Sequence, residues 1–102
     1  MKGDRLGEFE ELALLAVRAA GHDAYGATVQ ELIEREAARE VSLGAVYAAL
    51  DRMERKGYVR SALTGEPVGP GGKRRRVFTV TAAGIRAVQE ARRGREALWK
   101  AA

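Results

Sequence analysis

The sequence predicts a mostly helical α+β fold, in which three helices precede a two-stranded hairpin and a C-terminal helix. Three observations predict it. Apolar residues recur at helical spacing over residues 7–20, 28–39 and 42–56. Two short segments rich in Val, Phe and Tyr then flank a loop, residues 64–73, that holds four glycines and both prolines. Residues 81–102 return to helical spacing, and 102 residues suffice for one small domain.

The first two helices carry ordinary start signals. Residues 7–20 are apolar on nearly all sides, and acidic residues in the first turn suit the positive end of the helix dipole. Glycines at both ends of residues 21–27 break the chain. We expect the second helix over residues 28–39, with Thr28 as its cap and Glu31 as the capping-box partner.

The third helix, residues 42–56, has two unlike faces. Ser42 is a favourable N-cap, and Gly57 follows the last turn as a stop signal. An apolar stripe is expected to face the core, and its members are Leu43, Val46, Leu50 and Met53. The other face begins with small residues that let the backbone approach a partner, namely Ser42, Gly44, Ala45 and Ala48.

The hairpin strands are predicted over residues 58–63 and 74–80. In the second strand Arg76, Phe78 and Val80 share one face, and Arg75, Val77 and Thr79 share the other. The composition of the loop indicates mobility. Four consecutive cations, Lys73–Arg76, follow the loop. On its own such a run is also typical of an edge strand that uses charge to prevent pairing with other chains.

The last helix begins at Thr81, a suitable cap, and is about 28 Å long at 1.5 Å per residue. Its stripe consists of Ile85, Val88, Arg92, Arg95 and Trp99. A terminal helix with one Trp, added to a domain that is already closed, is a candidate dimerisation arm. Trp99 is interpreted as a dimer anchor, with the wall of an effector pocket as the alternative.

This order of elements is that of a winged helix-turn-helix. We assign residues 1–80 to a DNA-binding domain and residues 81–102 to a C-terminal dimerisation helix packed on the same single domain. In such a fold the recognition helix (42–56) enters the major groove and the basic wing (64–76) contacts the DNA backbone. Charge supports a polyanionic partner, because residues 60–102 hold 10 Lys/Arg against 3 Asp/Glu.

The alternative is a winged-helix module that binds another protein without specific DNA binding. Such a module has no need for the four cations, and its third helix would present apolar residues outward. An enzyme is not expected, because the chain has one His, no Cys and no phosphate-binding glycine motif after a strand. No cofactor or metal site is predicted. An acidic N-terminal segment and the lack of a long apolar run indicate a cytoplasmic protein without membrane contact.

The chain resembles the PadR family, regulators named for the phenolic acid decarboxylase repressor. The segments that carry the resemblance are Leu6–Leu15, Tyr25–Gly26, Ser42–Val59, Arg74–Gly84 and Trp99. The third helix keeps most of the family motif but has Ala45 where the family usually has Thr, and Ala48 where it usually has Pro.

The resemblance implies a homodimeric regulator, usually a repressor, that binds double-stranded operator DNA with pseudo-palindromic sequence. In some members a small aromatic or drug-like effector binds near the dimer interface and weakens DNA binding. The candidate DNA-binding residues are Ser42, Gly44, Ala45, Tyr47, Ala48, Arg52, Lys73, Arg74, Arg75 and Arg76. Candidates for the dimer interface or effector pocket are Phe9, Leu12, Ile85, Val88, Arg92, Leu98 and Trp99.

Two of these assignments have structural alternatives. Tyr47 flanks the apolar stripe, so its ring could instead cover the edge of the core. Arg52 lies on the open face of the third helix, where it could reach DNA or pair with Asp51, Glu54 or Glu36.

Overall fold

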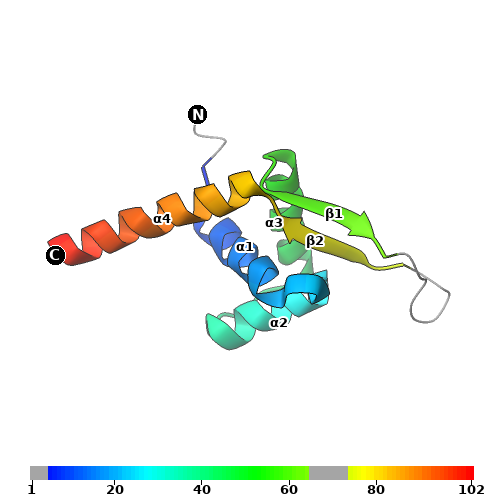
Figure 1. Cartoon of the computed structure of the whole chain (residues 1–102). Helices are drawn as coiled ribbons and strands as arrows, with labels where there is room; N and C mark the ends of the chain where they lie inside the picture. The colour runs from blue at the N-terminus through cyan, green and yellow to red at the C-terminus, as the bar shows by residue number, and fades with distance from the viewer. Residues whose placement is uncertain (1–4, 65–73) are drawn as a thin grey trace.

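The computed structural model describes residues 5–64 and 74–102, and it confirms the predicted order of helices and strands (Figure 1). A short 3-10 helix, η2, joins the first two helices. The elements are α1 (Glu8–Ala20), η2 (Gly21–Asp23), α2 (Gly26–Glu36), α3 (Leu43–Arg55), β1 (Val59–Leu63), β2 (Arg76–Val80) and α4 (Ala82–Ala101).

The core lies where α1, α2 and α3 meet the hairpin. The largest fully buried side chains come from all three helices and both strands, and they are Phe78, Leu14, Leu50, Met53, Val17, Val29, Val46 and Val59. Burying one such side chain stabilises the fold by about 1.5–3 kcal/mol before the entropy of ordering it is counted. A single apolar cluster, to which the hairpin also contributes, therefore holds α1, α2 and α3 together.

The second helix begins earlier than the sequence predicts. It starts at Gly26 with Tyr25 at the N-cap position, so the predicted cap at Thr28 is wrong. The reason lies outside the helix. Tyr25 forms a β-bridge with Val77, and the Phe78 N–H donates to the Ala24 carbonyl oxygen at 2.9 Å. These tertiary contacts fix the chain immediately before the helix and override the local capping signal.

The third helix has the predicted boundaries but a slightly different buried face. The Ser42 hydroxyl accepts the Ala45 N–H at 3.0 Å, and Gly57 ends the helix in a left-handed conformation with φ of 81°. Leu43, predicted to belong to the core stripe, is 40% exposed, because the first turn of α3 projects beyond the core. Ala49 is buried on the core face instead.

The strands pair antiparallel, from Val59 opposite Val80 to Leu63 opposite Arg76. Phe78 is fully buried while Thr79 is exposed, as the predicted alternation requires. The glycine-rich loop, whose composition predicts mobility, lies outside the described residues.

The last helix packs on the core through its first turns, and an ion pair between Arg95 and Glu11 of α1 ties its second half to the body. Thr81 caps it by accepting the Gly84 N–H at 3.1 Å, and Val88 is 4% exposed. From residue 92 onward every residue is exposed. Figure 1 shows α4 and the hairpin leaving the helical body in opposite directions. Among the described residues, no helix has the length and apolar character needed to cross a membrane.

Candidate nucleic-acid interface

The outer face of α3 is bare at its N-terminal end. Ser42, Gly44, Ala45 and Ala48 are all exposed, as predicted. None has a side chain longer than a hydroxymethyl group, and the Ser42 hydroxyl already caps the helix. This end of the helix therefore offers backbone and small side chains to a partner, with few groups that can hydrogen-bond to a base edge.

Tyr47 is fixed between α2 and β2. Its ring is half-buried and lies 6.3 Å from the Phe78 ring, centroid to centroid. It also packs directly on Gly26, where an added Cβ would lie 2.4 Å from the Tyr47 Cζ atom. The ring thus covers the edge of the core, and its hydroxyl end lies against Gly26.

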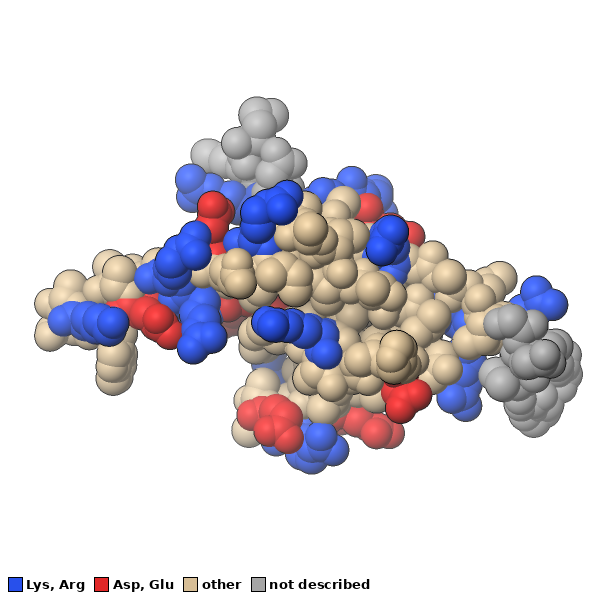
Figure 2. All heavy atoms as spheres, viewed as in Figure 1, with Lys and Arg blue, Asp and Glu red and all other residues tan. Residues whose placement is uncertain are grey.

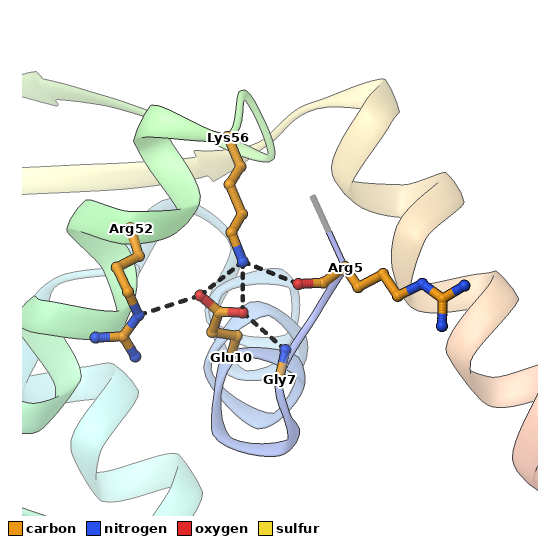
Figure 3. Close-up of polar contacts among 5 residues, drawn as sticks. All are labelled: Arg5, Gly7, Glu10, Arg52 and Lys56. Atoms are coloured by element: carbon orange, nitrogen blue, oxygen red, sulfur yellow. Dashed lines mark hydrogen bonds and ion pairs between the residues drawn. The ribbon is translucent and has the colours of Figure 1, made fainter. Parts of the chain in front are cut away.

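Arg52 and Lys56 meet a buried carboxylate of α1 (Figure 3). Glu10 is 5% exposed, and it accepts Lys56 Nζ at 2.9 Å and Arg52 Nε at 3.2 Å. It also caps its own helix by accepting the Gly7 N–H at 2.7 Å, while Lys56 Nζ donates to the Arg5 carbonyl at 2.9 Å. The first helix is therefore tied to the C-terminal half of α3 by ion pairs. In Figure 3 the terminal nitrogens of Arg52 point away from Glu10.

These contacts control the charge state of Glu10. Burial by itself raises the pKa of Glu10, but hydrogen bonds from the Gly7 N–H, Lys56 and Arg52 outweigh it, so the pKa lies below its ordinary value. Glu10 is therefore ionised at neutral pH and remains an acceptor for both cations.

The wing cations fall into two groups. Arg74 and Arg75 are exposed, and the Arg75 guanidinium lies 5.1 Å from the centre of the Tyr25 ring. Lys73 lies outside the described residues. Figure 2 shows basic side chains beside the outer end of the hairpin and along α4. Arg74 and Arg75 are thus placed to meet a polyanion at the wing.

Arg76 faces the other way, toward α3. Its Nη1 lies 3.0 Å from Asp51 Oδ1, its Nη2 lies 2.6 Å from Glu54 Oε1, and its Nε donates to Ser61 Oγ at 3.1 Å. A hydrogen bond from the Ser61 hydroxyl and, to a lesser extent, one from Arg76 lower the pKa of Glu54. Together they outweigh burial, which by itself raises this pKa. We refer to Asp51, Glu54, Ser61 and Arg76 as the wing-root cluster.

The candidate dimer residues also divide into two sets. Val88 belongs to the core of its own chain, and Phe9 is half-buried beneath the Arg39 guanidinium, 5.2 Å from the ring centre. Ile85 and Leu12 are half-buried, whereas Leu98 and Trp99 are 74% and 84% exposed. Arg92 is exposed and pairs with Glu96 in the same helix at 2.9 Å. The exposed apolar groups of α4 thus lie in its last turns.

Leu12 lines an apolar groove of about 270 Å³ between α1 and α2. Leu15, which is 39% exposed, and Leu32 also line it. The groove is one part of the first helix that remains open to a partner or a ligand.

Sequence reasoning misses the two buried carboxylates of α1. Glu10 and Glu11 read as solvated first-turn charges, but they are 5% and 8% exposed, and Glu11 pairs with Arg95 of α4. Their partners lie 42 or more positions away in the sequence, so no local spacing signals the pairing.

Comparisons with known proteins agree with this geometry. A family described as the transcriptional regulator PadR-like family matches residues 14–90. A PadR family transcription regulator from Clostridium difficile R20291 is 23% identical, with a TM-score of 0.77 over 93% of this chain and 94% of that one. A transcriptional regulator from Clostridium thermocellum is 22% identical, with a TM-score of 0.72 over 90% and 86% of the two chains. No curated protein matches the chain.

Proposed function

Because the chain belongs to the PadR-like family of transcriptional regulators, we propose that it is a homodimeric repressor that binds operator DNA through α3 and the wing. The observation that carries the proposal is the bare outer face of α3. Small outward side chains let the backbone of a helix come close to base edges in a major groove about 12 Å wide. A protein-interaction module would present larger apolar side chains there, and Leu43 is the one such residue in the first turn.

The bare face also predicts how sequence is recognised. Gly44, Ala45 and Ala48 offer no hydrogen-bonding side chain, although the methyl group of Ala45 can contact that of a thymine. We therefore expect discrimination to come largely from Arg52, from Tyr47 and from the shape and deformability of the DNA.

The wing supplies the electrostatic part of binding. We expect Arg74→Gln and Arg75→Gln each to weaken binding to operator DNA and to reduce the slope of log affinity against log salt. Each cation that neutralises a phosphate contributes about one unit to this slope, so one substitution should remove about two units from a dimer. Fluorescence anisotropy titrations at a series of low to moderate salt concentrations measure this slope.

Arg35→Gln is the matched control, because Arg35 is exposed at the far end of α2 and pairs with Glu36. Its slope should equal that of the wild type. Unchanged slopes for both wing variants would refute the assignment of these residues to phosphate.

The dimer is proposed to form through α4 with help from α1. Among the described residues, the Arg95–Glu11 pair is the one ion pair that ties the second half of α4 to the body, yet this half ends in exposed Leu98 and Trp99. A second copy of this arm would cover these residues, with Trp99 as the anchor. Because a two-fold dimer matches a palindromic operator, the arrangement of half-sites in the bound DNA tests this proposal.

A small aromatic or drug-like effector is proposed only by analogy with some family members. The groove beside Leu12 adjoins the proposed dimer surface on α1 and is apolar. It is the place we would examine for such a ligand. Regulators of this family are generally not enzymes, and we propose no catalytic activity.

A further inference from the structure

We propose that Arg76 is a positioning residue, which fixes the wing to the recognition helix instead of contacting phosphate. The inference rests on the proposed DNA-binding function. It separates Arg76 from Arg74 and Arg75, with which it forms one basic run in the sequence.

The geometry of the Arg76 guanidinium indicates a positioning role. Each of its three nitrogens has a protein partner, and these partners are Asp51 and Glu54 on α3 and Ser61 on β1. The group also lies 4.8 Å from the centre of the buried Phe78 ring. A planar, multidentate group held in this way is pre-organised, and releasing it to follow a phosphate would break all of these contacts.

The net charge of the wing-root cluster also disfavours a phosphate contact. One guanidinium faces two carboxylates, so the cluster carries a formal charge of −1. A phosphate placed at this cluster would meet a net negative charge. Arg74 and Arg75 have no carboxylate partner among the described residues, which leaves them suited to the DNA backbone.

The wing-root cluster joins α3 to the start of β2. Asp51 and Glu54 lie on α3, one turn apart, while Arg76 is the first residue of β2 and pairs with Leu63 at the outer end of the hairpin. The cluster therefore sets the angle between α3, which is proposed to enter the major groove, and the start of β2, which Arg74 and Arg75 immediately precede. Fixing this angle places both contacts in register on one duplex before binding, which lowers the entropy cost of association.

The experiment compares Arg76→Gln, Glu54→Ala and Arg74→Gln with the wild type, using an operator duplex obtained by selection. Affinity is measured over a series of salt concentrations, and circular dichroism confirms that each variant is folded. We expect Arg76→Gln to bind roughly tenfold more weakly, equivalent to about 1.4 kcal/mol, with the wild-type salt slope. Arg74→Gln, the control, should have a smaller slope.

Glu54→Ala gives the sharpest contrast, because the two roles predict opposite signs. If Arg76 is a positioning residue, removing Glu54 loosens the wing and weakens DNA binding roughly tenfold. If Arg76 contacts phosphate, removing a competing carboxylate strengthens binding. Should Arg76→Gln fail to fold, the sign of the Glu54→Ala effect decides alone.

The proposal is overturned if Arg76→Gln reduces the salt slope as Arg74→Gln does, if Arg76→Gln binds as well as the wild type, or if Glu54→Ala binds as tightly as the wild type or more tightly. Failure of the proposed function looks different. In that case the wild-type protein itself binds no duplex, which removes the inference together with its premise.

Discussion

Replacing Gly84 with alanine is expected to lower the free energy of unfolding by about 3 kcal/mol. Gly84 lies in the first turn of α4, where the helix crosses the end of the hairpin. An added Cβ would lie 2.2 Å from the Tyr58 carbonyl oxygen and 2.9 Å from the Val80 Cγ1 atom. Neither distance is compatible with van der Waals contact, so the helix would have to move away.

The Tyr58 carbonyl group cannot move aside at a small cost in free energy, because hydrogen bonds already fix the backbone around it. The Tyr58 carbonyl accepts the Thr81 N–H at 3.0 Å, and the Thr81 hydroxyl donates to the Gly57 carbonyl at 2.6 Å. Moving α4 would break this junction between helix and hairpin.

Gly94→Ala is the control for the Gly84 variant. Gly94 lies in the same helix, and among the described residues no atom of another element lies within 4 Å of an added Cβ. Alanine there should raise stability by about 1 kcal/mol, since it is the better helix former. Urea unfolding should therefore give a lower free energy of unfolding for Gly84→Ala than for the wild type, and a higher one for Gly94→Ala. A Gly84→Ala protein as stable as the wild type would show that the close approach at Tyr58 is not maintained in solution.

Replacing Glu10 with glutamine is expected to lower the free energy of unfolding by about 2 kcal/mol at pH 7. The amide can still accept the Gly7 N–H but offers no charge to Lys56, which is only 19% exposed at its side chain, or to Arg52. Lys56 would be left as a largely buried cation without a counter-ion.

The destabilisation should depend on pH in a defined direction. The pKa of Glu10 is lower in the folded protein than its ordinary value of 4.5, so the ionised carboxylate stabilises the fold above that value. This contribution disappears as pH falls through the folded pKa. The difference between wild type and Glu10→Gln should therefore be full at pH 7 and shrink below about pH 4.5.

Glu8→Gln is the matched control, because Glu8 lies in the same turn and its pair with Arg39 is exposed. Its unfolding should differ little from the wild type at any pH. A Glu10→Gln difference that stays constant down to about pH 3 would contradict the role given to the ion pairs.

The sequence predicts the architecture well because the architecture is encoded in local signals. Helical spacing, the caps at Ser42 and Thr81, the stop at Gly57 and the two Val-rich strands each act within a few residues. Where the prediction of α2 is wrong, a contact across the fold decides the outcome, since the Tyr25–Val77 bridge fixes the helix start.

The candidate site is predictable only as a set of residues, and the role of each cation depends on tertiary partners. The run from Lys73 to Arg76 looks uniform in sequence, yet Arg76 turns inward while Arg74 and Arg75 face outward. Likewise Arg52 is exposed, as expected, but its ion-pair partner is Glu10, a residue 42 positions earlier. Burial and pairing across such separations cannot be derived from spacing within one element.

Together the two charge clusters hold the recognition helix from both sides. Glu10 ties the C-terminal half of α3 to α1, and Arg76 ties the same half to the wing. The N-terminal half remains bare and has no such ties among the described residues, which is the arrangement expected of the end that enters a groove. The orientation of α3 is thus determined by ion pairs at its C-terminal half.

Selection of bound duplexes from a random-sequence pool tests the central claim most directly. The wild-type chain should enrich a pseudo-palindrome whose half-sites are centred about one helical turn, 34–36 Å, or a multiple of it apart, because a two-fold dimer presents two copies of α3. Enrichment of such a sequence would support DNA recognition and dimer geometry at once. A pool that shows no enriched sequence would contradict the account and favour a winged-helix module that binds another protein.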